Sequence, residues 1–205
     1  MNNRKILGLA ALGTAAGGLL GCAALMAPPE PTPTEIKALL VASFKDNGQA
    51  KLDRLNQSEL QEACSTYAQD IAKLPGELRT KLQNDALNAV EYPADGKYLG
   101  DWKEGEKVAQ TGVGLQFSDK AGSPAGGNCY ACHQIDPKEI SYGNIGPSLY
   151  NYGKLRGVSN PSSPEAKPIV EYTWGKLQNA RACNACSSMP RFAHKGILTE
   201  TQIKH

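Results

Sequence analysis

The residues most able to do chemistry are the two cysteines and the histidine of Cys129-Tyr130-Ala131-Cys132-His133. This C-x-x-C-H spacing offers two thiols to the vinyl groups of a haem and places an imidazole beside them as an axial iron ligand. Paired cysteines also occur as redox disulfides and as parts of zinc sites. The surroundings of the motif favour the haem interpretation. We therefore expect one covalent haem c, attached at Cys129 and Cys132 and ligated by His133.

The second iron ligand follows by elimination. Of the three methionines, Met1 and Met26 fall in or beside an expected export signal, which leaves Met189 as the one that the mature chain surely keeps. Pro190 biases Met189 toward extended backbone and hence toward a loop. A lone methionine is normally core filler, but the polar residues around Met189 favour a thioether ligand, with His194 as the rival. Coordination by His and Met raises the potential of haem c relative to coordination by two histidines.

A second stretch, Gly146-Pro147-Ser148-Leu149, lies between the motif and Met189. Around Pro147 the chain can offer a backbone carbonyl to the His133 ring, the usual device for orienting a ligating imidazole. Leu149 is expected to pack on the haem edge. Taken alone, Gly-Pro-x-Leu is more often just a turn.

The remaining sequence predicts a mainly α protein. Amphipathic patterns predict one helix capped by Thr34, a second that starts with a capping box at Ser58 and a third from Glu77 to about Tyr92; a further helix capped by Asp101 precedes the motif. The turn-rich residues 92–96 separate a helical N-terminal extension (34–93) from a haem domain (94–205).

Residues 1–27 have the pattern of an export signal, because Arg4 and Lys5 precede the short apolar run 6–20. The run ends in Leu19-Leu20-Gly21-Cys22, which resembles a lipobox and would make Cys22 a lipidated N-terminus; ordinary cleavage near position 24 or 27 is the alternative. Residues 28–33 are a stiff proline-rich spacer. The sequence thus predicts a periplasmic protein that reaches a membrane only through a lipid at Cys22.

The overall charge argues against nucleic acid as a partner. The chain has 22 basic and 20 acidic residues, and removal of Arg4 and Lys5 leaves 20 of each. A neutral mature chain lacks the basic surface that nucleic-acid binding requires.

Three cysteines of the expected mature chain lie outside the haem motif and still need a role: Cys64, Cys183 and Cys186. Ser187 follows Cys186 where a second haem motif would need histidine, and a zinc site shared with the first motif would have to close a long gap. In an oxidising compartment a disulfide from Cys64 to Cys186 or Cys183 is favoured, worth about 4.7 kcal/mol at best for so long a loop. One thiol then stays free.

Three stretches together resemble SoxX, the monohaem c-type subunit of the SoxAX cytochrome: residues 127–134, 146–153 and 185–192. The run from Ser43 to Ser65 is similar to an extension that some members carry. The resemblance implies a class I-like cytochrome c domain in a periplasmic heterodimer with SoxA. That complex, an L-cysteine S-thiosulfotransferase, couples thiosulfate oxidatively to a cysteine of the carrier SoxYZ. The catalytic haem would lie in SoxA, while His133 and Met189 would hold a haem that passes electrons to a downstream cytochrome.

Two features depart from the family. Cys186 matches the family's cysteine before the ligand loop, but Cys183 stands where another residue is expected, which leaves the disulfide partner open. Family members continue into a C-terminal helix that packs across the helix preceding the motif. Here a capping box at Thr199 is soon followed by His205, so we expect a last helix that is truncated.

Two other functions remain as alternatives: a free-standing periplasmic cytochrome shuttle, and a haem enzyme such as a peroxidase, which needs an open iron position. The sequence shows no nucleophile, base or substrate pocket, so this chain is expected to contribute no catalytic residue of its own.

Overall fold

The computed structural model describes residues 29–205. The expected export signal and the lipobox cysteine Cys22 lie outside the described residues. Within 29–205, no helix has the length and apolar character needed to cross a bilayer.

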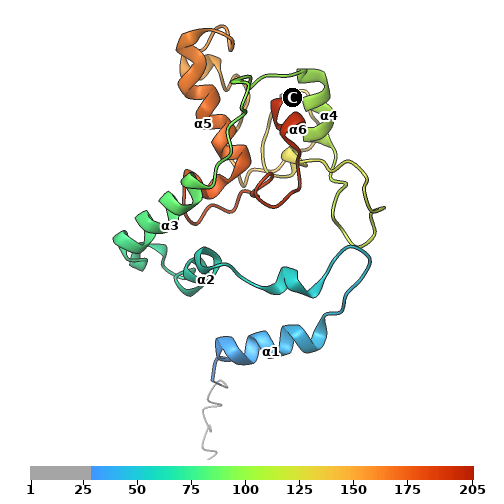
Figure 1. The fold of residues 1–205 in the computed structure, drawn as a ribbon, viewed down its shortest axis with the longest axis vertical. Helices are drawn as coiled ribbons and strands as arrows, with labels where there is room; N and C mark the ends of the chain where they lie inside the picture. Colours follow the sequence, from blue (N-terminus) through green and yellow to red (C-terminus); the bar gives the residue numbers. More distant parts are fainter. Residues whose placement is uncertain (1–28) are drawn as a thin grey trace, which may run out of the picture.

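The described chain is mainly helical, as predicted. Its β structure is a single isolated bridge between Asn47 and Ala50. Six α-helices are joined by short 3-10 turns and irregular loops: α1 Pro33–Ser43, α2 Glu59–Thr66, α3 Gly76–Asn88, α4 Trp102–Gln110, α5 Lys167–Gln178 and α6 Glu200–Lys204, with the 3-10 turns η1 Leu52–Leu55, η2 Ile71–Lys73, η3 Cys129–Ala131, η4 Lys154–Arg156, η5 Pro164–Ala166 and η6 Ala180–Ala182. Figure 1 shows α1 at one end of the molecule, α2 and α3 above it, and α4, α5 and α6 at the other end.

Local capping residues set most of the helix starts. The Ser58 N–H donates to Gln61 Oε1 at 3.1 Å at the start of α2, and the Lys103 N–H donates to Asp101 Oδ1 at 2.9 Å at the start of α4. Both caps were predicted. The prediction for α1 was wrong, because Thr32 rather than Thr34 is its cap. The helix begins earlier since Pro33 fits the first helical position, where its fixed φ is suitable and its missing N–H is not needed.

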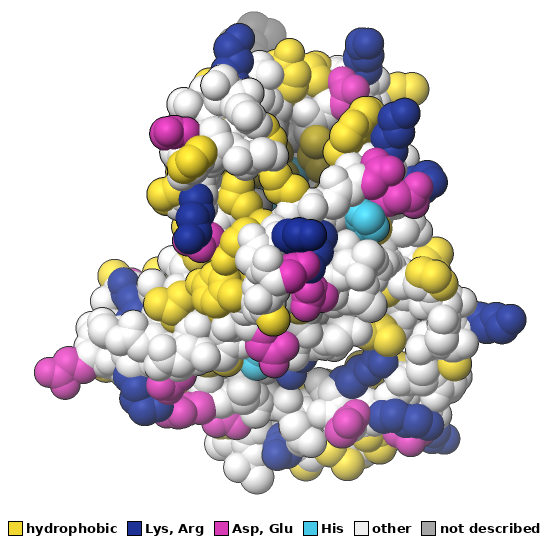
Figure 2. All heavy atoms as spheres, turned by 45° about the horizontal axis from the view of Figure 1, so that its top comes forward, with side chains coloured by type: hydrophobic (Ala, Val, Ile, Leu, Met, Phe, Trp, Pro, Cys, Tyr) yellow, Lys and Arg dark blue, Asp and Glu magenta, His cyan; other side chains and the backbone are white. Residues whose placement is uncertain are grey.

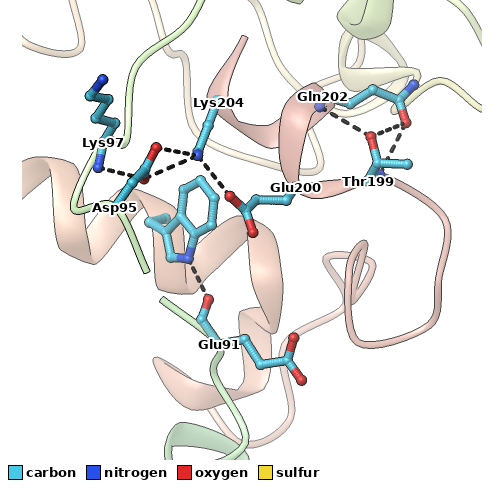
Figure 3. A network of polar contacts seen from close by, with 8 residues as sticks. Glu91, Asp95, Lys97, Thr199, Glu200, Gln202 and Lys204 are labelled. Atoms are coloured by element: carbon cyan, nitrogen blue, oxygen red, sulfur yellow. Dashed lines mark hydrogen bonds and ion pairs between the residues drawn. The ribbon is translucent and has the colours of Figure 1, made fainter. Parts of the chain in front are cut away.

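One hydrophobic core connects the N-terminal helices with the C-terminal third of the chain. Its buried members come from α2, α3, α5 and the residues around α6: Leu60, Leu82, Ala86, Val90, Trp174, Ala182, Phe192, Leu198 and Ile203. The Trp174 indole is 3% exposed, and its Nε1–H donates to Glu91 O at 2.7 Å (Figure 3). Helix α1 contributes no buried residue.

Helix α6 packs against α4, and the two lie side by side in Figure 1. The Gly100 N–H donates to Lys204 O at 2.6 Å, and the Asp101 N–H donates to His205 Nδ1 at 2.8 Å. Lys204 also pairs with Asp95 at 3.2 Å and with Glu200 at 2.7 Å (Figure 3). This packing fixes α4, whose C-terminal end leads toward the C-x-x-C-H motif.

Candidate haem site

The C-x-x-C-H motif forms a compact turn that brings its functional side chains close together. Cys129–Ala131 is a 3-10 turn, preceded by Asn128 in the left-handed region at φ 44°. The N–H groups of Cys132 and His133 both donate to Cys129 O, at 3.1 and 2.8 Å. Cys129 and Cys132 are free thiols, both half-buried, so the redox-disulfide alternative finds no support here.

His133 is oriented by the stretch around Pro147. Its Nδ1 lies 2.6 Å from Pro147 O, the contact that the sequence predicts. Because a carbonyl can only accept, Nδ1 must carry the proton, and the other ring nitrogen, Nε2, keeps the lone pair that binds a metal. The protein thus provides an imidazole in the tautomer that an axial ligand needs.

Backbone hydrogen bonds fasten the Pro147 stretch to the motif. The Gly146 N–H donates to Cys132 O at 2.9 Å, and the Leu149 N–H donates to Gln134 O at 2.7 Å. At Gly146, a Cβ atom would lie 2.5 Å from His133 Nδ1 and 2.7 Å from Nε2. Only glycine leaves room for the ring. From the sequence, Gly146 is recognised only as part of a turn. Its close approach to the His133 ring is a tertiary contact that no local pattern reveals.

Met189 lies in an irregular loop beside the core. It is half-buried and packs against the core cluster. Phe192 follows three residues further on and lies close to Gly127. A Cβ atom added to Gly127 would be 3.8 Å from the Phe192 ring and 3.0 Å from Cys129 Sγ. The segment that follows Met189 therefore approaches the residues beside Cys129 at Phe192. The rival His194 is exposed over much of its surface, but partial burial of its ring, together with the charges of Arg191 and Lys195, lowers its pKa.

The disulfide question has a definite answer. Cys64 on α2 is bonded to Cys186, with their Cα atoms 5.5 Å apart, and Cys183 is free. Because Cys186 is engaged, the four-cysteine zinc site cannot assemble. Among residues 29–205 no group of three or more His, Cys, Asp or Glu side chains is placed to hold a metal ion.

The surroundings of the motif suit a large apolar group. After the motif, residues 140–155 expose an unusual number of large hydrophobic side chains, namely Ile140, Tyr142, Ile145, Tyr150 and Leu155. Figure 2 shows a hollow on one face of the molecule, with hydrophobic side chains along its walls. Exposed apolar surface of this kind commonly marks a binding site. Burial also raises the pKa of the Cys129 thiol, as an apolar environment does.

These observations fit the expected haem. Cys129 and Cys132 would hold the porphyrin covalently, and His133 presents its free Nε2 beside them. Met189 would supply the second axial ligand from its loop. Leu149 is half-buried, and Pro147 serves through its carbonyl oxygen.

No known family model matches the chain. It is similar to an uncharacterized lipoprotein from Aquifex aeolicus, with 34% identity over 155 residues that cover 72% of this chain and 66% of the relative. The chain thus spans about two thirds of the relative's length. The likeness to SoxX stays a prediction from the sequence.

Proposed function

We propose that this chain is an exported monohaem c-type cytochrome of the class I kind, which transfers single electrons. The observation that carries the proposal is the 2.6 Å contact between His133 Nδ1 and Pro147 O, which leaves Nε2 free beside two unpaired cysteines. The packing of α6 against α4 is also the arrangement that the resemblance to SoxX implies. Bound haem c supplies a one-electron iron couple.

The chain's own residues favour electron transfer over haem enzymology. Phe192, three residues after Met189, approaches Gly127 beside Cys129, so the Met189 loop is the segment that would supply a thioether to the second axial position. An occupied position leaves no site for peroxide on the iron. The core cluster also packs against Met189, which limits the freedom of its side chain to move away.

We further propose that the chain is the SoxX-like subunit of a SoxAX complex. In this function it accepts electrons when a SoxA-like partner couples thiosulfate to a cysteine of SoxYZ, and it passes them to a downstream cytochrome. The support is the resemblance of the three stretches around the haem ligands. The alternative is a free-standing shuttle. Co-purification with a second haem subunit from the native host favours the complex, whereas isolation as a monomer from the same cells favours the shuttle.

The proposed location is the periplasm, with a tether to the membrane. The similar Aquifex aeolicus protein is a lipoprotein, and Cys22 follows a lipobox-like Leu-Leu-Gly in this sequence. A lipid on Cys22 would anchor a domain that itself remains in water. The intact mass of the mature protein tests this, because an N-terminus downstream of Cys22 rules out the lipid.

The haem proposal is tested by the mass and the reduced-minus-oxidised visible spectrum of the exported protein. We expect one covalent haem in the wild type and in both Met189→Ala and His194→Ala. Met189→Ala should lose the absorption signature of thioether ligation, and His194→Ala, the matched control, should keep it. A colourless wild type with the mass of bare polypeptide would overturn the proposal.

A further inference from the structure

The loop that carries Met189 has few restraints of its own. Residues 183–190 form neither helix nor strand. In its central part, both backbone N–H bonds are local: Ser187 donates to Asn184 O at 3.0 Å, and Met189 donates to Ser187 Oγ at 3.2 Å. Such bonds shape the loop but do not fix it to the rest of the protein.

The Cys64–Cys186 disulfide supplies the missing connection. Cys64 lies one turn after Leu60 on α2, and the Leu60 side chain is buried in the core. The capping box of Ser58 and Gln61 further fixes this helix. Cys186 is therefore bonded to a rigid element. Met189 follows Cys186 by three residues, so chain length alone limits its Cα to about 10 Å from that bond.

Helix α2 has core contacts besides the disulfide. Leu60 lies in the same buried cluster as Leu82 and Phe192, so we expect α2 to keep these apolar contacts when the bond is absent. The loop has less support of this kind: Ala185 is buried and Met189 is half-buried against the core, but Ser188 and Pro190 on either side of Met189 are exposed. Loss of the disulfide should therefore affect the loop more than the helix.

We propose that the Cys64–Cys186 disulfide is a redox-sensitive positioning element for the Met189 thioether. A dithiol reductant would break the S–S bond by giving it two electrons and two protons, forming two thiols and leaving the reductant as a disulfide. The freed loop would then no longer hold the thioether opposite His133. This inference rests on the proposed haem function, because it assigns the disulfide to one of the two iron ligands.

Cys183 provides the matched control. It lies on the same loop, and its thiol is free. It is near enough to Tyr172 to contribute to the raised pKa of that phenol. Substitution of Cys183 removes a sulfur from the loop without removing its connection to α2. It also prevents Cys183 from pairing with Cys186 after reduction.

The experiment compares the holoproteins Cys64→Ser/Cys186→Ser and Cys183→Ser. We expect both to carry one covalent haem by mass. The double variant should lose most of the long-wavelength absorption of a thioether-ligated oxidised haem and show a lower midpoint potential, because methionine ligation raises it. Cys183→Ser should match the wild type. If the double variant keeps both signals and only melts earlier, the disulfide is merely structural and the proposal is wrong.

Two further measurements keep the test decisive. If the double variant fails to fold, wild-type holoprotein is reduced with a phosphine, its thiols are alkylated, and the same two signals are recorded. In haem-free protein, hydrogen exchange of residues 186–190 should rise several-fold on reduction while that of α2 changes little. Unchanged exchange in the loop would refute the positioning role. A colourless wild type whose loop still loosens on reduction would contradict the haem function alone.

Discussion

Gly146→Ala should displace the proposed proximal ligand. The added Cβ would lie 2.5 Å from His133 Nδ1 and 2.7 Å from Nε2, whereas ordinary contact begins at 3.4 Å. The ring would have to move by more than the difference at Nδ1, about 0.9 Å, because Cε1 would lie closer still to the added Cβ; such a shift is enough to break the 2.6 Å bond from Nδ1 to Pro147 O. The backbone cannot easily yield, because the Gly146 N–H is bonded to Cys132 O at 2.9 Å.

The expected loss of unfolding free energy in Gly146→Ala combines two effects. The lost hydrogen bond contributes about 0.5–1.5 kcal/mol, and overpacking adds about 1–3 kcal/mol. The haem content by visible spectrum and mass, and the unfolding free energy by denaturant titration, measure the outcome. Gly153→Ala is the control, since its Cβ would meet Val158 only at 3.6 Å and the residue has helical φ and ψ. Wild-type haem content, spectrum and stability in Gly146→Ala would refute the reasoning.

Two further predictions concern stability. The pKa of His194 is lowered by burial and by the charges of Arg191 and Lys195, so the folded protein binds this proton less readily than the unfolded chain. The unfolding free energy measured by denaturant titration should therefore decline as the pH falls from about 7 toward 5, and His194→Gln should make that decline less steep. The same pH dependence in the wild type and the variant would contradict this prediction. Trp174→Phe removes the 2.7 Å bond to Glu91 O and leaves that carbonyl without its partner, at a cost of about 1–3 kcal/mol in unfolding free energy. If the unfolding free energy does not change, the prediction is wrong, and a water molecule donates to Glu91 O in place of the indole.

Local patterns predicted the local structure well. The caps at Ser58, Asp101 and Thr199 form as expected, because a capping box involves residues that lie within one turn of each other. The contact between His133 and Pro147 O was also predicted, since the motif and the Gly-Pro stretch restrict where a carbonyl is available. The fold class followed from the same periodic patterns. The cap of α1 was misplaced because Pro33 was treated as part of the spacer.

Distances between remote segments were beyond prediction. The sequence left the partner of Cys64 open between Cys186 and Cys183, and the packing of α2 on the C-terminal third selects Cys186. The close approach of Gly146 to the His133 ring is likewise a tertiary contact. Glycine at that position is compatible with any turn, so its type alone carries no information about the ring.

The shared core gives the N-terminal extension a role in the site itself. Phe192 belongs to the same buried cluster as Leu60 and Leu82, and its ring also approaches Gly127, next to Cys129. The same phenylalanine follows Met189 by three residues, so α2 and α3 share a cluster with a residue close in sequence to one proposed ligand and close in space to the attachment motif. We expect a substitution in α2 or α3 that loosens this cluster to act on the proposed iron ligands without touching them. We therefore expect the extension to influence the haem environment mainly through packing, because the interactions that connect it to the site are apolar contacts and one disulfide.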